Sequence, residues 1–169
     1  LNGSNGFRLD GVTADDRLGD SVSNAGDVNG DGFDDLLVGA AFADPNGNYS
    51  GASYVLFGKA AGFSAEVDLS SLDGSNGFRL DGEKANDMAG SSVSNAGDVN
   101  GDGFDDLIIG APENMASPYN DHSGSSYVIF GKASGFDAVM DLSSLNGSNG
   151  FSLNGMAGDT LGSSVSGAG

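Results

Sequence analysis

Residues Ser21–Leu36 read SVSNAGDVNGDGFDDL, and the same sixteen residues recur unchanged at Ser92–Leu107. A second string, LNGSNGFRLDG at Leu1–Gly11, returns as LDGSNGFRLDG at Leu72–Gly82. Both pairs lie 71 residues apart, and a third copy of the second string opens at Leu145. Self-similarity at a fixed spacing is typical of repeat architectures. The fold can therefore be predicted by assigning the strands of a single repeat of about 71 residues.

The composition narrows the classes of function. The 169 residues include 24 acidic side chains against six basic ones, for a formal net charge of −18, and no Cys. Such an acidic surface repels nucleic acid, and without Cys neither disulfides nor thiolate metal sites can form. No run approaches the roughly 18–20 apolar residues of a membrane span. We therefore expect no nucleic-acid partner and no membrane span.

Each repeat predicts four short strands separated by turn-forming residues. In the first full copy these are residues 21–25, 35–39, 53–57 and 77–81, with apolar runs or alternation bounded by Gly. The stretch 66–72 is ambiguous between a short strand and a turn of helix. Tandem four-stranded units predict an all-β chain of β-propeller blades. A solenoid is the competing interpretation, but its repeats of about 20–45 residues are shorter.

The repeat boundaries predict how the chain is divided. We expect the last strand of a preceding blade at 1–17, full blades at 18–88 and 89–160, and the first strand of a third blade at 161–169. Two full blades with flanking strands cannot close a ring, because propellers have roughly four to eight blades. The expectation is a window from a longer repeat protein; the alternative is a protomer whose edges neighbours cover.

The most informative segment is an acidic loop. Asp27–Asp35 reads DVNGDGFDD, and Asp98–Asp106 repeats it. Oxygen side chains stand at positions 1, 3, 5 and 9, Gly at position 6 permits a sharp turn, and position 7 offers its carbonyl. This pattern suits Ca²⁺ better than Mg²⁺, which prefers a stricter octahedron. An EF-hand is not expected, because it needs a carboxylate at position 12, where this chain has Val38 or Ile109. The alternative interpretation is a turn rich in Asp, Asn and Gly that binds no metal.

A Leu18-Gly19 pair precedes the first loop, an Ala89-Gly90 pair precedes the second, and the sequence LIIGAP at Leu107–Pro112 follows the second loop. Together with the loop, these motifs resemble the FG-GAP repeat of the integrin α-subunit β-propeller and of many large secreted bacterial proteins. The resemblance implies that a calcium loop joins the first two strands of each blade, and that Asp34 and Asp105, at position 8, point outward. It implies two Ca²⁺ ions with these ligands: Asp27, Asn29, Asp31, the Phe33 carbonyl and Asp35; Asp98, Asn100, Asp102, the Phe104 carbonyl and Asp106.

No catalytic residue is predicted. The single His, His122, is expected to be solvated, and no Ser/His/Asp set recurs. The resemblance implies a calcium-binding adhesion or structural module that is extracellular or at the cell surface, and we expect it not to be an enzyme. Its partners would be a protein or glycan at the cell surface, or neighbouring repeats. The alternatives are a non-catalytic propeller platform of a secreted hydrolase and a self-assembling filament or ring subunit.

Overall fold

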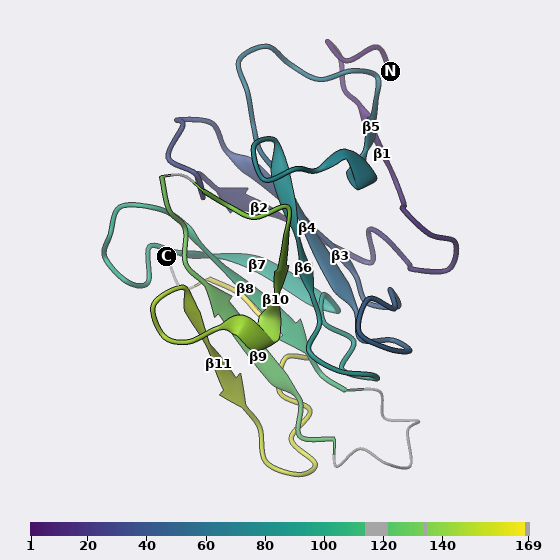
Figure 1. Cartoon of the computed structure of the whole chain (residues 1–169), viewed down its shortest axis with the longest axis vertical. Helices are drawn as coiled ribbons and strands as arrows, with labels where there is room; N and C mark the ends of the chain where they lie inside the picture. The colour runs from purple at the N-terminus through teal and green to yellow at the C-terminus, as the bar shows by residue number, and fades with distance from the viewer. Residues whose placement is uncertain (114–121, 134, 168–169) are drawn as a thin grey trace.

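The computed structural model describes residues 1–113, 122–133 and 135–167, and in this part every regular element is a strand or a single 3₁₀ turn (Figure 1). The all-β prediction is therefore confirmed. The strands are β1 (Arg8–Asp10), β2 (Ser21–Gly26), β3 (Asp35–Ala40), β4 (Ala52–Leu56), β5 (Glu66–Asp68), β6 (Gly77–Asp81), β7 (Ser92–Gly97), β8 (Asp106–Ala111), β9 (Ser125–Ile129), β10 (Val139–Asp141) and β11 (Gly150–Asn154).

Two four-stranded antiparallel units dominate the structure. Strands β2, β3, β4 and β6 form one of them, here called blade 1, and β7, β8, β9 and β11 form blade 2. The strand order follows the chain in both, as expected of a propeller blade. The four strands predicted for the first full repeat are those of blade 1. The exact repeat boundaries stay a prediction.

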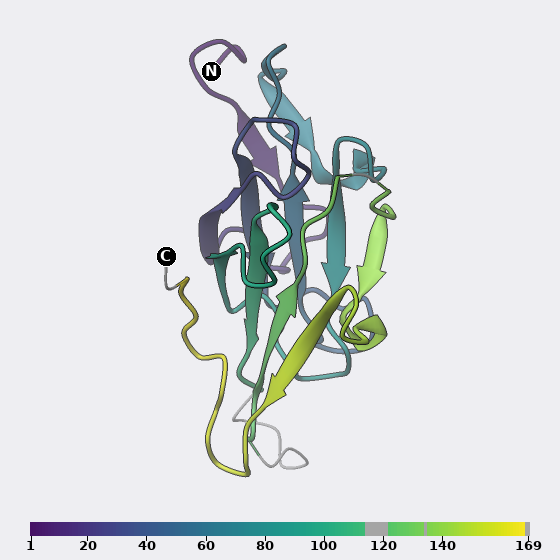
Figure 2. The same cartoon turned by 90° about the vertical axis from the view of Figure 1, so that its left-hand side faces the viewer.

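The ambiguous stretch between the third and fourth strands contains both predicted elements. A three-residue strand, β5 or β10, leads into a 3₁₀ turn at Leu69–Ser71 or Leu142–Ser144. Strand β10 pairs in parallel with β6 of blade 1, and β5 pairs in parallel with β1 (bright green beside teal for β10 and β6 in Figure 2). Each short strand therefore binds to the outer strand that precedes its own blade, which periodicity alone did not predict.

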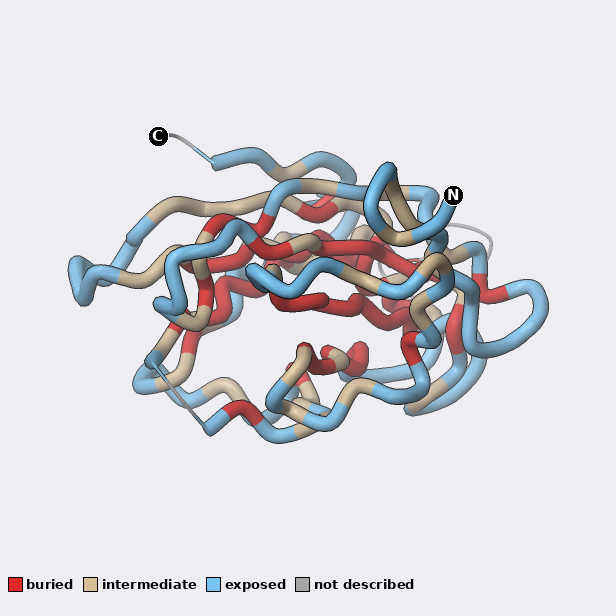
Figure 3. Tube along the Cα trace, turned by 90° about the horizontal axis from the view of Figure 1, so that it is seen from above, coloured by how far each residue is buried: buried red, intermediate tan, exposed pale blue. Residues whose placement is uncertain are grey.

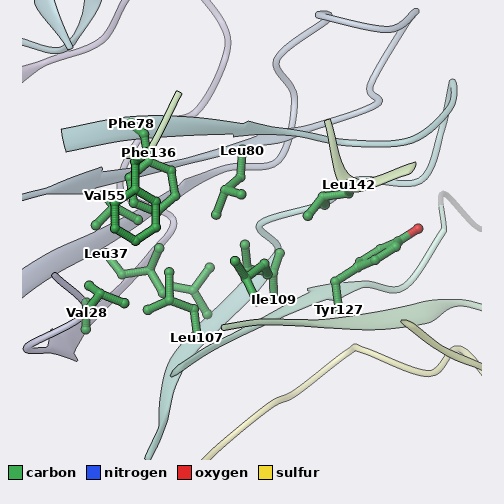
Figure 4. Packing of buried hydrophobic residues seen from close by; sticks show 14 of the residues in the cluster. Val28, Leu37, Val55, Phe78, Leu80, Leu107, Ile109, Tyr127, Phe136 and Leu142 are labelled. Atoms are coloured by element: carbon green, nitrogen blue, oxygen red, sulfur yellow. The ribbon is translucent and has the colours of Figure 1, made fainter. Parts of the chain in front are cut away.

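The main hydrophobic core lies between the two blades (Figure 4). Leu37, Val55 and Leu80 of blade 1 face Leu107 and Ile109 of blade 2, and all five side chains are fully buried. Burial of each such side chain contributes roughly 1.5–3 kcal/mol. Figure 3 shows the buried stretches in the interior of the molecule and the exposed ones at its periphery. The few large apolar residues of the chain are thus concentrated where one sheet covers the next.

Glycines of the repeat motif let the blades approach closely. A Cβ atom on Gly39, at the end of β3, would lie 2.1 Å from the carbonyl oxygen of Gly90, which precedes β7. In the next repeat, a Cβ on Gly110 would lie 2.0 Å from the carbonyl oxygen of Gly162. Because no side chain fits at these distances, the glycines are required by packing between successive repeats.

Candidate metal centre

The first acidic loop joins β2 to β3, as predicted, and its side-chain oxygens turn inward onto backbone N–H groups. The Asp31 N–H donates to Asp27 Oδ1 at 3.0 Å and to Asn29 Oδ1 at 2.9 Å. The Gly32 N–H donates to Asp27 Oδ2 at 2.9 Å, and the Phe33 N–H donates to Asp31 Oδ1 at 3.0 Å. These short-range bonds explain why a nine-residue segment folds as one turn, because Asp and Asn readily bind the backbone just ahead of them.

The second acidic loop, between β7 and β8, repeats this geometry. The Asp102 N–H donates to Asp98 Oδ1 at 3.0 Å and to Asn100 Oδ1 at 2.9 Å. Gly103 N–H donates to Asp98 Oδ2 at 2.9 Å, and Phe104 N–H donates to Asp102 Oδ1 at 3.0 Å. Identical residues therefore give the same inward-turned oxygens in both repeats.

The position-9 carboxylate of the first loop lies beneath the turn and is buried. Asp35 is 3% exposed; its Oδ2 accepts from the Val28 N–H at 3.1 Å and its Oδ1 from the Gly58 N–H at 2.8 Å. Burial is the main cause that raises the pKa of Asp35 to about 6. The two N–H groups oppose that shift, and the charges of Asp31 and Asp27 add to it. Three carboxylates are thus close enough to repel one another.

Asp106 occupies the same place in the second loop. It is fully buried, with Oδ2 accepting from the Val99 N–H at 2.8 Å and Oδ1 from the Gly131 N–H at 2.9 Å. Burial raises its pKa, and the charge of Asp102 raises it further. Both position-9 side chains therefore fasten the loop to the end of the third strand of its blade as well as closing the turn.

The chemistry of the donor set fits a hard cation, although the side-chain oxygens do not converge on one point. Within residues 1–113, 122–133 and 135–167, no three His, Cys, Asp or Glu side chains stand at metal-holding distances. The physical reason is visible in the first loop, where the Asp27, Asp31 and Asp35 carboxylates each accept from backbone N–H groups. The donors are all oxygen, mostly carboxylate and gathered around one turn, which is the set that Ca²⁺ takes.

One expectation about position 8 is wrong. Asp34 is exposed, and its Oδ2 accepts from Asn24 Nδ2 at 3.4 Å. Asp105 does not point outward: its Oδ2 accepts from the Asp27 N–H at 2.8 Å, across the boundary between blades. The two repeats have the same residues here, so only the position of the neighbouring blade distinguishes them. No signal within a single repeat could have shown this.

One other expectation, outside the acidic loops, also needs correction. His122, expected to be solvated, is half-buried, and its carbonyl oxygen accepts from the Thr160 N–H at 2.9 Å. Arg79, in β6, is half-buried and binds Asp81 through Nη2 at 2.8 Å. It lines a cavity of about 490 Å³ together with Asp16, Phe42, Asp44 and Tyr54. Sequence reasoning missed this cavity.

The repeats match a known family. Residues 18–56 and 89–129 each match the model of the FG-GAP repeat. The chain carries two FG-GAP repeats. Each match begins at a predicted motif pair, Leu18-Gly19 or Ala89-Gly90, and ends in the third strand of a blade. Each FG-GAP match therefore encloses one acidic loop and the three strands around it.

The chain is also similar to individual curated proteins. It is 42% identical to integrin alpha-PS5 of Drosophila melanogaster over 57% of this chain and 9% of the relative. It is 34% identical to integrin alpha-3 of Cricetulus griseus over 72% of this chain and 11% of the relative. Human phosphatidylinositol-glycan-specific phospholipase D is 36% identical over 70% of this chain and 14% of that protein.

These likenesses concern only the repeats, because the chain spans about a tenth of the length of each relative. The FG-GAP repeats are of the kind present in integrin α chains. The expectation of a bacterial-type protein finds no support in these three animal relatives. Within the described residues, no helix has the length and apolar character required to span a membrane.

Proposed function

We propose that this chain is a calcium-binding module of an extracellular or cell-surface adhesion protein, with one Ca²⁺ for each FG-GAP repeat. The observation that carries the proposal is the pair of acidic loops whose side-chain oxygens turn inward in the same way. The likeness to integrin α chains supports an adhesion setting with a protein or glycan partner. A non-catalytic role agrees with the same likeness.

The ligands of the first ion would be Asp27, Asn29, Asp31, the Phe33 carbonyl and Asp35. The equivalent set in the second loop is Asp98, Asn100, Asp102, the Phe104 carbonyl and Asp106. A bound Ca²⁺ supplies positive charge that offsets the repulsion among three carboxylates. The residues themselves fix the turn, because each of the acidic side chains also holds a backbone N–H group. Asn at position 3 lowers the charge of the site and weakens affinity relative to Asp.

Calcium should therefore stabilise the fold under extracellular conditions. Extracellular modules of this kind bind at about 10⁻⁴–10⁻³ M, so millimolar calcium fills them and cytosolic calcium does not. At a hundredfold excess over Kd, ligand linkage adds about 2.7 kcal/mol for each site. Each hairpin that holds a Ca²⁺ ion would thus add stability to a chain whose apolar core is small.

The proposal is tested by thermal unfolding with calcium and with chelator. In wild type we expect calcium at a hundredfold excess over Kd to raise Tm by about 5–10 °C for each filled site. Asp31→Ala and Asp102→Ala should each lose the gain of one site, and the double variant should lose both. Asp20→Ala is the control, because Asp20 is exposed and its carboxylate lies 3.8 Å from Arg17 Nη1 in an exposed ion pair. Equal Tm with and without calcium in wild type would contradict the proposal.

A second candidate is a non-catalytic platform carried by a secreted hydrolase. The observation that favours it is the 36% identity to a phospholipase D over 70% of this chain. That likeness lies in the repeats and covers 14% of the relative, so it concerns the platform and not its chemistry. Sequencing of the flanking gene distinguishes the two: a catalytic motif beside the repeats supports the platform, and uninterrupted FG-GAP repeats support the adhesion module.

A further inference from the structure

The two acidic loops are joined to each other by hydrogen bonds between the blades. Asp105 Oδ2 accepts from the Asp27 N–H at 2.8 Å, and the Asp105 N–H donates to the Asp27 carbonyl oxygen at 3.4 Å. The Lys132 N–H, which follows β9, donates to the Val28 carbonyl oxygen at 3.0 Å. The first two residues of the first loop are thus fixed by blade 2.

Side-chain packing strengthens this junction. A Cβ on Gly30 would lie 2.4 Å from Cε1 of Phe104, so the Phe104 ring covers the tip of the first loop. Val28 is 1% exposed, whereas the equivalent Val99 of the second loop is 52% exposed. The same sequence is buried in one loop and open in the other because blade 2 lies over the first loop only.

We propose that the two calcium loops are energetically coupled, so that Ca²⁺ in the loop 98–106 raises the Ca²⁺ affinity of the loop 27–35, with Asp105 as the positioning residue. This inference rests on the proposed calcium function. Asp105 stands between two proposed ligands of the second ion, the Phe104 carbonyl and Asp106. Closing the second loop around an ion therefore fixes Asp105 from both sides.

A fixed Asp105 in turn fixes Asp27, which provides the first ligand of the other ion. The first loop then loses less conformational freedom when it binds, which is a route to positive coupling without a large structural change. By linkage the effect is reciprocal, and an ion in the first loop raises the affinity of the second equally.

Electrostatics acts in the opposite direction. An ion in one loop cancels negative charge that would attract the other ion, but this effect acts through solvent and is screened within a Debye length of about 8 Å at physiological salt. The hydrogen bonds and the Phe104 contact are direct and are not screened in this way. We therefore expect net positive coupling at physiological ionic strength, and weaker coupling at low salt.

The test is calorimetric titration of the whole chain with CaCl₂ at about 0.15 M salt. Asp102→Ala removes the second site, and the affinity of the remaining first site should fall about five- to tenfold below its wild-type value, within the usual range of coupling. Asp105→Ala should still bind two ions, and adding Asp102→Ala to it should no longer lower the calcium affinity of the first site. Asp105→Asn should restore the coupling, because an amide oxygen accepts the same Asp27 N–H. Asp34→Ala is the matched control, with the same loss of charge at the exposed position 8 of the first loop.

The possible outcomes separate the two proposals. No calcium bound by the wild type would overturn the calcium function together with the coupling. Two ions bound with an unchanged first-site affinity in Asp102→Ala would overturn the coupling alone. If Asp34→Ala and Asp105→Ala reduce the coupling between the two sites equally, the Asp105–Asp27 hydrogen bond is not its cause. The loss of one negative charge would then account for the effect. If Asp105→Ala does not fold, the comparison of wild type with Asp102→Ala still decides whether coupling exists.

Discussion

At the scale of single residues, aspartate has two structural roles in this chain. Besides the proposed calcium ligands, Asp68 and Asp141 accept from Ser70 and Ser143 N–H groups and cap the two 3₁₀ turns. Asp73 binds the N–H and hydroxyl of Ser75, and this hydroxyl lowers the pKa of Asp73. The abundance of Asp in the sequence therefore reflects turn formation as well as metal binding. The acidic composition alone does not identify the site.

Gly39 gives a prediction about the glycines between blades. Gly39→Ala would place a methyl group against the Gly90 carbonyl, and the backbone must shift to admit it. We expect the free energy of unfolding to fall by about 1–3 kcal/mol, as for other overpacked sites. Urea denaturation measures the change. Gly11→Ala is the control, because a Cβ there meets only ordinary contacts at 3.7 Å, and an equal loss in both variants would contradict the packing argument.

Asp87 gives a prediction about pH. Burial raises its pKa to about 6, and Oδ1 has no hydrogen-bond partner in the described part of the chain. The folded pKa lies above the unfolded one, so the folded state holds the proton more tightly and stability falls as pH rises from about 4 through 6. Asp87→Asn removes this loss. In chelator, the variant should therefore gain about 1–3 kcal/mol over wild type between pH 4 and pH 7, measured by urea unfolding. A pH-independent difference would contradict the assignment.

At the scale of elements, the sequence was most informative where interactions are local. The acidic loops are held by bonds between residues two to five positions apart, so their spacing predicts the turn. The strands of each blade show the alternation or apolar runs that burial requires. Strands β5 and β10 were not predicted to pair as they do, because each is three residues long and its partner lies in the preceding repeat. The inward direction of Asp105 escaped prediction for the same reason.

The segment before β10 gives a prediction at this scale. Phe136 reaches across to blade 1 and stacks on Phe78, with ring centroids 4.5 Å apart and planes 7° apart. Phe136→Ala should cost about 3–5 kcal/mol, because it empties the core between the blades. Phe63→Ala is the matched control from the first repeat, where the ring packs on Phe7 and is less buried. We expect a smaller loss there in urea unfolding; equal losses would contradict the importance of the inter-blade core.

At the scale of the whole molecule, stability comes from contacts between successive repeats. The core, the motif glycines, the β10–β6 pairing and the junction of the acidic loops all cross the boundary between blades. Two Ca²⁺ ions would change the net charge of −18 by four, to −14, so calcium acts on local repulsion in each loop and not on the total charge. The repeat length and fold class follow from the sequence; the contacts between repeats required the structure.

The most direct test of the account is to count the calcium ions bound by the folded chain. Native mass spectra would be recorded after exchange into calcium and again after chelation, with Asp31→Ala, Asp102→Ala and the double variant alongside. The account predicts two ions on wild type, one on each single variant and none on the double variant. A folded wild-type chain that binds no calcium would contradict it, and the acidic loops would then serve only as turns.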